Sequence, residues 1–380
     1  MTLTTFAELG LSENIVATLT ALGFATPTPI QEKGIPVVLG GRDLIGLAQT
    51  GTGKTAAFGL PLIEMLLKDE KRPENRTTRT LILAPTRELV NQIGDNLRSY
   101  LRRLPLKINQ VVGGASIGKQ QLQLEKGTDI LVATPGRLLD LIARNAISLR
   151  AVRYLVLDEA DQMLDLGFIH ALRAIAKHVP QKRQTLFFSA TMPPEIEKLA
   201  NTILKDPVTV EVTPVSSTAD TIKQSIYFVD KPDKRKLLKH LLDELKINHT
   251  LIFTRTKHGA DRIARDLIKD GVKAAAIHGD KSQGARQRAL TEFKDRTLRV
   301  LVATDIAARG IDIDDLTYVF NYDLPNVPET YVHRIGRTGR AGRDGIAVSF
   351  AEIRDRRRIM DIEQYTRTPF KAEVIPGLEP

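Results

Sequence analysis

The sequence predicts an α/β protein made of two tandem domains, each a parallel sheet flanked by helices. Short runs of leucine and β-branched residues alternate with longer amphipathic stretches along the chain, as they do in strand–helix–strand units. The second half also repeats the first. Thr80-Leu81-Ile82 returns as Thr250-Leu251-Ile252, and Leu131-Val132-Ala133-Thr134 returns as Leu301-Val302-Ala303-Thr304, at one common offset. Two matches at one offset indicate a duplicated domain, although short buried strands also match by coincidence.

The domain limits follow from where this alternation stops. The clearest strands of the first half are expected at 81–83, 130–132, 154–157 and 185–188, and the second half opens with a strand at 224–229. Prolines and small polar residues after Asp206 interrupt the pattern and indicate a linker. We expect a first domain over 1–208, a linker over 209–219, a second domain over 220–365 and a C-terminal extension over 366–380.

The composition is that of an ordinary globular protein with an excess of basic residues. With 380 residues, of which 42% are hydrophobic, the chain can bury two or three cores. The formal net charge of +10 favours a polyanionic partner, without separating RNA, DNA and anionic lipid. Cysteine is absent, which excludes disulfides and thiolate zinc sites and permits a reducing compartment.

The sequence shows no sign of a targeting or membrane segment. Residues 1–22 carry Glu8 and Glu13 and lack the basic start of a signal peptide. No apolar run approaches the ~18 residues that span a bilayer. We therefore expect a cytoplasmic protein with no membrane partner.

A glycine-rich loop, Ala48-Gln49-Thr50-Gly51-Thr52-Gly53-Lys54-Thr55, follows an apolar run and leads into an expected helix over 56–67. Such a loop presents backbone N–H groups at the positive end of a helix dipole, where they can hold phosphates. Lys54 is expected to reach the β- and γ-phosphates, and Thr55 to coordinate Mg²⁺. A glycine turn before an ordinary helix is the alternative. The residues expected to hold the nucleotide here are Thr50, Gly51, Thr52, Gly53, Lys54 and Thr55.

An acidic segment, Asp158-Glu159-Ala160-Asp161, follows an apolar run that is typical of a buried strand. Its carboxylates would emerge at the carboxyl edge of the sheet, where ligands bind in open parallel sheets and where the glycine loop is also expected. Asp158 can hold Mg²⁺, and Glu159 can orient and deprotonate the attacking water. Alternatively, the acids only cap the next helix and interact with its dipole.

The order and content of these motifs resemble those of the DEAD-box RNA helicases, over nearly the whole chain. The resemblance implies two RecA-like domains. The segment Phe24-Ala25-Thr26-Pro27-Thr28-Pro29-Ile30-Gln31 resembles the Q motif of that family, which implies adenine recognition by Gln31, stacking by Phe24 and support from Phe6. A carboxamide can pair with the N6 and N7 edge of adenine. A proline turn with Gln31 near a helix start is the alternative.

Ser189-Ala190-Thr191 resembles the family motif that couples hydrolysis to strand separation. We accordingly expect a coupling role for Ser189, Thr191, Asp161 and His333. The simpler alternative is that the hydroxyl groups cap the following helix.

Several turns of both halves resemble the RNA-contacting motifs of the family. They combine exposed amides, hydroxyls and arginines, which suit sugar and phosphate oxygens and carry no base code, so RNA binding should be independent of sequence. Taken singly, each is an ordinary loop. The expected RNA contacts are Pro85, Thr86, Arg87, Gly113, Gly114, Thr134, Pro135, Gly136 and Arg137 in the first half and Arg255, Gly279, Arg286 and Thr304 in the second.

The segment from His333 to Arg340 resembles motif VI of the family, and Ala308-Arg309-Gly310-Ile311-Asp312 resembles motif V. The resemblance implies that Arg337 and Arg340 act as arginine fingers on the γ-phosphate and that Gly310 and Asp312 contact the nucleotide, Asp312 at the ribose. Planar guanidinium groups stabilise the charge of phosphoryl transfer. A solvated basic loop is the alternative. With these arginines on the other domain, the ATP site would be complete only when the domains close, and ATP and RNA should tighten each other's binding.

The whole sequence predicts an RNA-dependent ATPase that uses ATP and Mg²⁺ to unwind short RNA duplexes locally or to remodel ribonucleoproteins. Its expected partners are single-stranded or short duplex RNA, through backbone and 2′-hydroxyl contacts, and ribosomal or RNA-decay complexes. An ATP-gated RNA clamp without useful unwinding and a DNA translocase of the wider helicase superfamily are the alternatives. A pure RNA-binding protein fits least well.

The C-terminal region is less informative. The arginine run from Arg354 to Arg358 is expected to form a solvated helix face rather than a dedicated RNA site. The ending Ile375-Pro376-Gly377-Leu378-Glu379-Pro380 resembles the bacterial RhlE-like branch of the family, in which a basic tail would follow.

Overall fold

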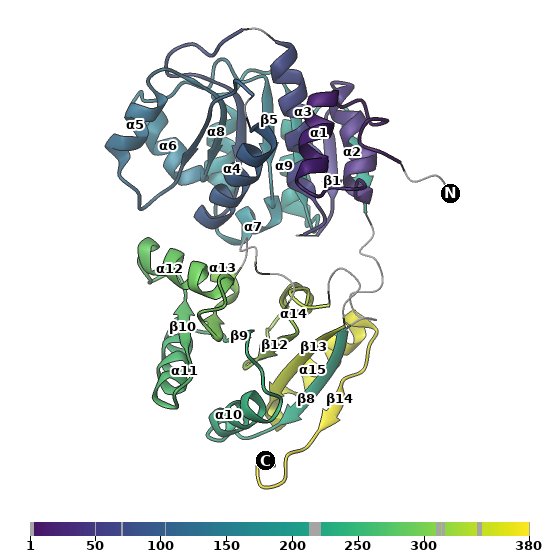
Figure 1. Cartoon of the computed structure of the whole chain (residues 1–380), viewed down its shortest axis with the longest axis vertical. Helices are drawn as coiled ribbons and strands as arrows, with labels where there is room; N and C mark the ends of the chain where they lie inside the picture. Colours follow the sequence, from purple (N-terminus) through teal and green to yellow (C-terminus); the bar gives the residue numbers. More distant parts are fainter. Residues whose placement is uncertain are drawn as a thin grey trace. The chain divides into compact units, whose positions relative to one another are not determined.

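The apolar runs of the sequence form the strands of two parallel sheets, one in each half of the chain (Figure 1). The computed structural model describes residues 4–49, 51–69, 71–102, 104–212, 222–308, 313, 316–339 and 344–379. The chain divides into a first unit, Met1–Pro214, and a second unit, Val215–Pro380. Each unit has a seven-stranded sheet, and the strand pairs described are all parallel. The predicted fold class is therefore confirmed.

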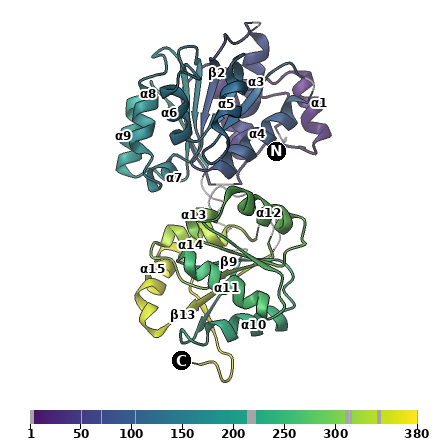
Figure 2. The same ribbon diagram turned by 90° about the vertical axis from the view of Figure 1, so that its left-hand side faces the viewer.

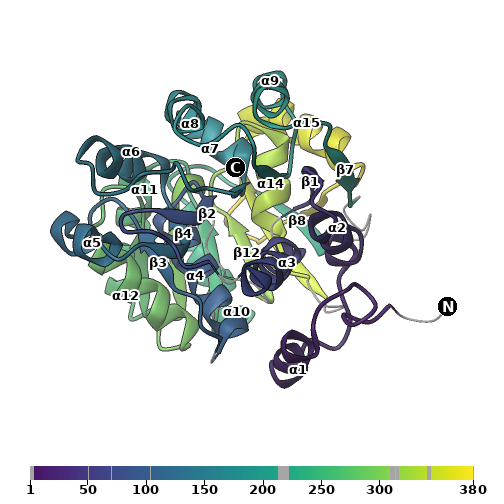
Figure 3. The ribbon, with the colours of Figure 1, turned by 90° about the horizontal axis from the view of Figure 1, so that it is seen from above.

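The first unit has the strand order β3-β4-β2-β5-β6-β1-β7. Strands β2, β4 and β6 are buried along their whole length, as expected for a parallel sheet that helices cover on both faces. One face packs against α2, α3 and α4 and the other against α6, α8 and α9; Figure 3 shows α8 and α9 across the strands from α2 and α3. The strands are β1 (Leu44–Leu47), β2 (Thr78–Leu83), β3 (Ile108–Val111), β4 (Thr128–Ala133), β5 (Tyr154–Leu157), β6 (Gln184–Ser189) and β7 (Val208–Glu211). The helices are α1 (Glu13–Ala21), α2 (Pro29–Leu39), α3 (Lys54–Lys68), α4 (Arg87–Leu101), α5 (Ile117–Leu124), α6 (Pro135–Ala143), α7 (Ala160–Asp165), α8 (Ile169–Ala176) and α9 (Pro194–Ile203).

The second unit has the strand order β10-β11-β9-β12-β13-β8-β14. Helices α10 and α11 cover one face, whereas α12 to α15 supply the cores on the other (Figure 2). The strands are β8 (Ile222–Phe228), β9 (Thr250–Phe253), β10 (Ala274–Ile277), β11 (Val300–Ala303), β12 (Tyr318–Asn321), β13 (Gly345–Ala351) and β14 (Lys371–Glu373). The helices are α10 (Lys234–Glu244), α11 (Lys257–Lys269), α12 (Gln283–Lys294), α13 (Asp305–Ala308), α14 (Pro328–Ile335) and α15 (Arg356–Thr366), which follows a short 3₁₀ turn, η1 (Ile353–Asp355).

The two sheets repeat one another in strand order and in register. β2 and β4 occupy the same positions in the first sheet as β9 and β11 in the second. The matched leucines are also aligned in the same way, because Leu81 pairs with Leu131 and Leu251 pairs with Leu301. The internal repeat seen in the sequence is therefore a repeat of structure.

Two edge strands lie where the sequence placed a linker and an extension. β7 pairs with β1 through Leu44↔Val208, so the first sheet continues into the segment expected as linker over 209–219. β14 pairs with β8 through Lys371↔Ser225, inside the expected extension over 366–380. Edge strands this short give only a weak pattern in the sequence. The prediction of a linker and an extension gave more weight to the prolines around them than to their β-branched residues. Residues 213–219 lie outside the described part, and the other expected limits stay predictions.

Strand β1, which carries the glycine-rich loop, depends on a glycine in its middle. Gly46 lies beside Phe188 of β6, and a Cβ atom on Gly46 would lie 2.5 Å from Phe188 Cδ1. The phenyl ring is fully buried and packs against Phe58 of α3 with ring centroids 5.5 Å apart. Phe58 is also fully buried.

We predict that Gly46→Ala destabilises the protein by about 1–3 kcal/mol through overpacking. The matched control is Gly34→Ala in α2, where the added Cβ would meet Leu44 Cδ2 at an ordinary 3.7 Å and helix propensity should improve by about 0.5–1 kcal/mol. Thermal unfolding followed by circular dichroism measures both changes. Equal unfolding midpoints for the two variants would contradict the packing argument.

Candidate nucleotide and RNA sites

The glycine-rich loop joins β1 to α3 at the carboxyl edge of the first sheet. Gly51 and Gly53 have φ angles of 83° and 90°, a left-handed conformation that glycine adopts without steric cost. Helix α3 begins directly afterwards at Lys54, so the N–H groups of its first turn have no partner within the helix. Thr52 closes the loop by donating from Oγ1 to Gln49 O at 2.7 Å. This backbone can hold a phosphate as the sequence predicted; Thr50 lies outside the described residues.

Gln31 fastens the start of α2 to this loop. Its Oε1 accepts from Thr28 N at 3.0 Å, and its Nε2 donates to Gly53 O at 3.1 Å. Thr28 adds a bond from Oγ1 to Thr52 O at 2.8 Å. A Cβ on Gly53 would lie 2.4 Å from Gln31 Nε2, so this close approach needs glycine. Both ends of the carboxamide are bonded within the chain, and adenine recognition by Gln31 stays a prediction.

The two phenylalanines expected beside the adenine lie in different environments. Phe6 is buried in the core cluster of the first unit. Phe24 is half-buried and meets Tyr100 of α4 edge to face, with ring centroids 6.1 Å apart. Phe24 thus retains exposed surface for stacking, whereas Phe6 supports the core around it. Their adenine contacts stay predictions.

Three charged side chains meet at the end of the phosphate loop. Lys54 Nζ lies 3.6 Å from Asp158 Oδ1 and 4.0 Å from Glu159 Oε1, and all three residues are almost fully buried. Burial lowers the pKa of Lys54, but the carboxylates outweigh it and hold this pKa above its ordinary value. Burial also raises the pKa of Asp158, to about 6, against the opposing effect of Lys54. The sequence-predicted catalytic residues of the first unit are therefore brought together.

This cluster is not satisfied by its own contacts. Within the described residues, Lys54 Nζ and Asp158 Oδ1 are buried without a hydrogen-bond partner, and 3.6 Å is too long for one. Buried polar atoms are rarely left in this state. Such an arrangement leaves donors and acceptors for a phosphate oxygen, a metal ion or its water.

Glu159 holds an unusual backbone conformation, with φ of 54° and ψ of 53°. A glutamate in the left-handed region costs free energy, and such strain concentrates at functional sites. The turn leads directly from β5 into α7. It lets Asp158 and Glu159 both lie beside Lys54.

Asp161, the fourth residue of the acidic segment, connects instead to the end of β6. Its Oδ2 accepts from both Thr191 N and Thr191 Oγ1 at 3.0 Å, and its N–H donates to Ser189 Oγ at 3.2 Å. Ser189 Oγ in turn donates to Thr191 O at 2.7 Å. The three first-unit residues expected in coupling therefore form one network, while His333 belongs to α14 of the second unit.

The expected RNA contacts of the first unit follow neighbouring strands β3, β4 and β2. Arg87 begins α4, and its guanidinium lies so close to the glycine pair after β3 that a Cβ on Gly114 would be 2.1 Å from Nη1. Arg137 Nη1 donates to Ala115 O at 3.0 Å in the same loop. The segments thus gather at one end of the sheet edge. The residues concerned are Pro85, Thr86, Arg87, Gly113, Gly114, Thr134, Pro135, Gly136 and Arg137.

The second unit repeats this arrangement. Arg255, Gly279 and Thr304 follow β9, β10 and β11, which are neighbours in the sheet, and Arg286 lies in the first turn of α12. Arg255 is exposed, whereas Thr304 is buried. Both units therefore place their expected RNA contacts at equivalent positions on a sheet edge.

Arg334 of α14 was given no role by the sequence, yet it organises the second unit. It is buried and binds Asp305 with both Nε and Nη2, at 2.5 and 2.8 Å. Nη1 donates to Asn321 Oδ1 and Asp323 O, and the guanidinium lies 5.1 Å from the ring centroid of Phe253. The segment that resembles motif VI contains Arg334, but Asp305 lies 29 residues earlier, and nothing in the sequence showed that the two pair.

The predicted arginine finger Arg337 lies one turn beyond His333. Both line a small cavity together with Phe253, Asp305 and Arg334, and Arg337 lies in the turn directly after α14, beside the same buried network. Arg340, Gly310 and Asp312, which were also expected to contact the nucleotide, lie outside the described residues.

Comparison with known proteins identifies the family. A family model described as DEAD/DEAH box helicase matches residues 28–199, and one described as Helicase conserved C-terminal domain matches residues 233–342. The ATP-dependent RNA helicase CshA of Limosilactobacillus reuteri is 44% identical over 364 residues, which cover 95% of this chain and 72% of that protein. The chain belongs to the DEAD-box family of ATP-dependent RNA helicases. A second DEAD-box relative, CshA of Geobacillus kaustophilus, is 42% identical over 379 residues, 99% of this chain and 80% of that protein.

Solved DEAD-box structures have the same architecture. S. cerevisiae Dbp5 bound to RNA and ADP BeF3 is similar with a TM-score of 0.85 and 32% identity, over 98% of this chain and 95% of that one. A DEAD box protein from the hyperthermophile Methanococcus jannaschii is 40% identical with a TM-score of 0.55, over 98% and 99% of the two chains. The two RecA-like domains predicted from the sequence are therefore confirmed.

The family assignment also confirms the predicted activity. As a DEAD-box protein the chain is an ATP-dependent RNA helicase, of a family that hydrolyses ATP and unwinds or remodels RNA. These relatives do not support the RhlE-like branch, because they carry the name CshA. None of the helices in the described ranges combines the length and apolar character of a bilayer crossing.

The buried DEAD-box cluster makes stability depend on pH, and this dependence should grow when its lysine is removed. The pKa of Asp158, about 6, lies above its ordinary value, so the stability that its protonation gives is present at low pH and is lost as the pH rises through about 6. Lys54 offsets this loss by stabilising the charged carboxylate.

We predict that Lys54→Met destabilises the protein by about 2–3 kcal/mol near pH 8, and by less below about pH 6. Unfolding midpoints measured across this pH range test the prediction. Lys33→Met, which removes an exposed lysine of α2, is the control and should change little at any pH. A Lys54→Met penalty that stays constant with pH would contradict the assigned role of the pair.

Proposed function

We propose that the first unit binds ATP as its Mg²⁺ complex and that Glu159 activates the water that attacks the γ-phosphate. The buried cluster of Lys54, Asp158 and Glu159 carries this proposal. Its unsatisfied lysine and carboxylate lie next to a loop that exposes backbone N–H groups, so phosphate oxygens and a cation can complete the contacts that the chain leaves open. Thr52, Gly53 and the other loop residues supply N–H donors.

Magnesium fits the donors that are present. Among the described residues, no group of three His, Cys, Asp or Glu side chains lies close enough to hold a metal ion alone. Mg²⁺ is commonly bound by one or two protein oxygens together with substrate phosphates and water. Thr55 Oγ1 and the carboxylate of Asp158 would provide those oxygens, and the ion would offset the charge of the phosphates.

The nucleotide base would be held beside α2. We propose that Gln31 reads adenine by exchanging its bonds to Thr28 and Gly53 for bonds to the base, with Phe24 stacking nearby and Phe6 supporting the loop. Because Gln31 bonds to the phosphate loop, such an exchange would also move Gly53. Base recognition and phosphate binding would then be linked.

The second unit would complete the site. Arg337 and Arg340 would contact the γ-phosphate, and Gly310 and Asp312 the nucleotide, when RNA holds the two units together. Arg337 is presented by a helix that Arg334 anchors to Asp305. The network of Asp161, Ser189 and Thr191, with His333 from the second unit, would carry the state of the phosphate to the RNA contacts. ATP and RNA would then favour the same state, and each would tighten the other.

The expected RNA residues at the sheet edges would hold the sugar-phosphate backbone, with RNA preferred through its 2′-hydroxyl groups. The basic net charge of +10 supports a polyanionic ligand. We further propose a cytoplasmic protein that joins ribosomal or RNA-decay complexes, from the resemblance of its motifs. Membership of the RhlE-like branch stays a prediction that rests on the C-terminal residues alone.

Steady-state ATP hydrolysis at low salt is the direct test. We expect strong stimulation by single-stranded RNA, little by DNA of the same sequence, and a requirement for Mg²⁺. Glu159→Gln should abolish turnover while ATP still binds, because the amide keeps the shape of the side chain and removes the base. Equal stimulation by RNA and DNA would favour a DNA translocase. RNA-stimulated hydrolysis without displacement of a short duplex strand would favour an RNA clamp.

The arginine finger has its own test. We predict that Arg337→Ala loses RNA-stimulated hydrolysis by a factor on the order of 10³–10⁵, while a fluorescent ATP analogue still binds. Arg265→Ala, which removes an exposed arginine of α11 outside these motifs, is the matched control. Circular dichroism confirms that both variants fold. Turnover of Arg337→Ala at the wild-type rate would refute the assignment.

A further inference from the structure

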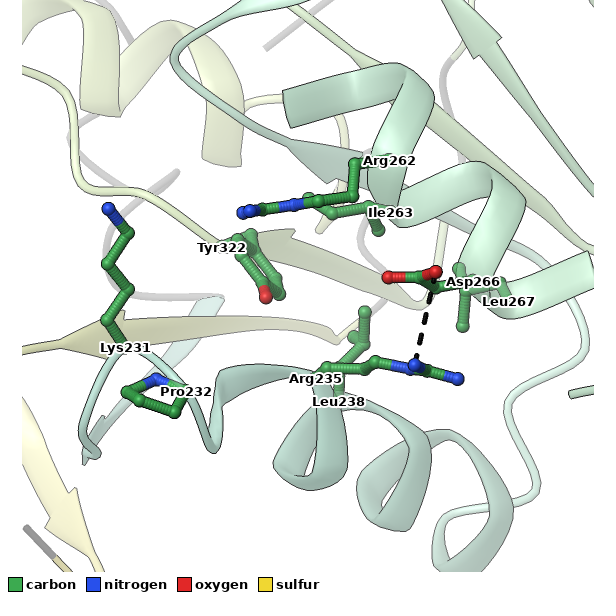
Figure 4. A pocket seen from close by; sticks show the side chains of 9 residues that line it. All are labelled: Lys231, Pro232, Arg235, Leu238, Arg262, Ile263, Asp266, Leu267 and Tyr322. Atoms are coloured by element: carbon green, nitrogen blue, oxygen red, sulfur yellow. Dashed lines mark ion pairs between the residues drawn. The ribbon is translucent and has the colours of Figure 1, made fainter. Parts of the chain in front are cut away.

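A basic cavity of about 580 Å³ opens at the carboxyl edge of the second sheet. It is lined by residues that follow β9, β12 and β13 and by the starts of the helices around them, among them Arg255, Arg262, Asp323 and Arg357. A second cavity of about 370 Å³, between α10 and α11, shares Lys231, Arg262 and Tyr322 with the first (Figure 4). The two hollows therefore adjoin, with these three residues between them.

Six of the seven described cations around this cavity fall into two classes, and the seventh, Arg255, donates from Nη2 to Leu324 O at 3.4 Å. Lys234, Arg354 and Arg358 are paired with carboxylates of Asp323, Glu352 and Asp355. The side chains of Lys231, Arg262 and Arg357, by contrast, make no hydrogen bond or ion pair within the part of the chain that the structure describes. Figure 4 shows Arg262 directed toward the side of Tyr322 where Lys231 lies, while Arg235 points away to Asp266.

The acidic lining does not cancel this charge. Asp323 is engaged by Thr254 Oγ1 at 2.8 Å and Arg255 N at 3.1 Å. Burial raises the pKa of Asp323, but these hydrogen bonds outweigh it and hold the pKa below its ordinary value. Asp361 also lines the cavity, one helical turn from Arg357 in α15, and makes no ion pair among the described residues. Among the described residues, the lining thus has three unpaired cations and one unpaired carboxylate.

The position of the cavity indicates what binds there. The RNA contacts proposed for this unit follow β10, β11 and β9, and the next strands along the same edge are β12 and β13. Adjacent strands lie about 4.8 Å apart, so the cavity extends the row of contacts by about 10 Å. Arg255 belongs to both, since it is a proposed RNA contact and also lines the cavity.

We propose that this cavity binds phosphate groups of single-stranded RNA that extends beyond the core RNA contacts, through Lys231, Arg262 and Arg357. The inference rests on the proposed RNA contacts of the second unit. Guanidinium groups bind phosphate oxygens with paired hydrogen bonds, and such contacts do not distinguish one base from another. The site would therefore lengthen the RNA footprint without adding sequence preference. Arg354 and Arg358 shape the cavity but are already compensated by carboxylates.

Two double variants with the same loss of charge separate this site from a general electrostatic effect. Arg262→Ala with Arg357→Ala removes two cavity arginines. Arg265→Ala with Arg356→Ala removes two exposed arginines from the same helices, α11 and α15, that do not line the cavity. Affinity for single-stranded RNA of ~8 and ~25 nucleotides is measured over a range of salt, with ATP hydrolysis stimulated by the short RNA as a second readout.

We expect the cavity variant to bind the long RNA about tenfold more weakly and to lower the salt slope by about 1.4, the value for two phosphate contacts on a single strand. It should bind the short RNA and hydrolyse ATP as the wild type does. The control variant should match the wild type for both lengths. These three results together support the proposal.

Three other results would overturn it. An equal loss in both double variants would show a general effect of charge. A loss for short and long RNA alike would place the cavity within the core footprint. Unchanged RNA binding, combined with loss of binding to polyglutamate, would show that the cavity receives an acidic protein. Failure of short RNA to stimulate hydrolysis by the wild type would instead contradict the proposed function, so the two failures are distinguishable.

Discussion

Parallel strand pairing is the constraint on which both sites depend. Parallel strands end at a common edge of the sheet. The segments that follow them therefore lie on one surface, even when they are far apart in sequence and differ in local conformation. In the first unit this edge holds the phosphate loop after β1, the acidic segment after β5 and the hydroxyl network after β6. The RNA-type turns follow β3, β4 and β2 at the other end of the same edge. The strand order of one sheet thus separates the residues proposed to bind the nucleotide from those proposed to bind the RNA backbone.

The buried charges of the two units differ in how fully they are satisfied. Arg334 makes four hydrogen bonds and contacts an aromatic ring, so its network is complete and fixes α14. Lys54 and Asp158 lie 3.6 Å apart without a hydrogen bond. A satisfied network is rigid, so the arrangement around Arg334 suits a scaffold. An unsatisfied buried charge is costly, so the arrangement of Lys54 and Asp158 suits a site that a ligand completes.

The sequence predicted the features that lie within one contiguous segment, but not those that depend on contacts between distant segments. The phosphate loop and the segment from Asp158 to Asp161 are contiguous, so their chemistry could be recognised before their geometry was known. The pairing of Arg334 with Asp305 joins residues far apart in the chain, and the edge strand β14 is defined by its partner β8. Arg356 and Arg357 are neighbours in one basic run, and only the fold shows that one of them lines the cavity.

The duplicated fold also shows how the two units differ at equivalent positions. β1 and β8 occupy equivalent positions, and the helix after each begins with a buried lysine, Lys54 or Lys234. Each lysine faces an aspartate after the equivalent strand, at 3.6 Å for Asp158 and 3.5 Å for Asp323. Lys234, however, also donates to Tyr322 O at 3.1 Å, and no glycine loop precedes it. The second unit therefore keeps the charge pair as a structural element, next to the cavity for which we propose RNA phosphates as the ligand.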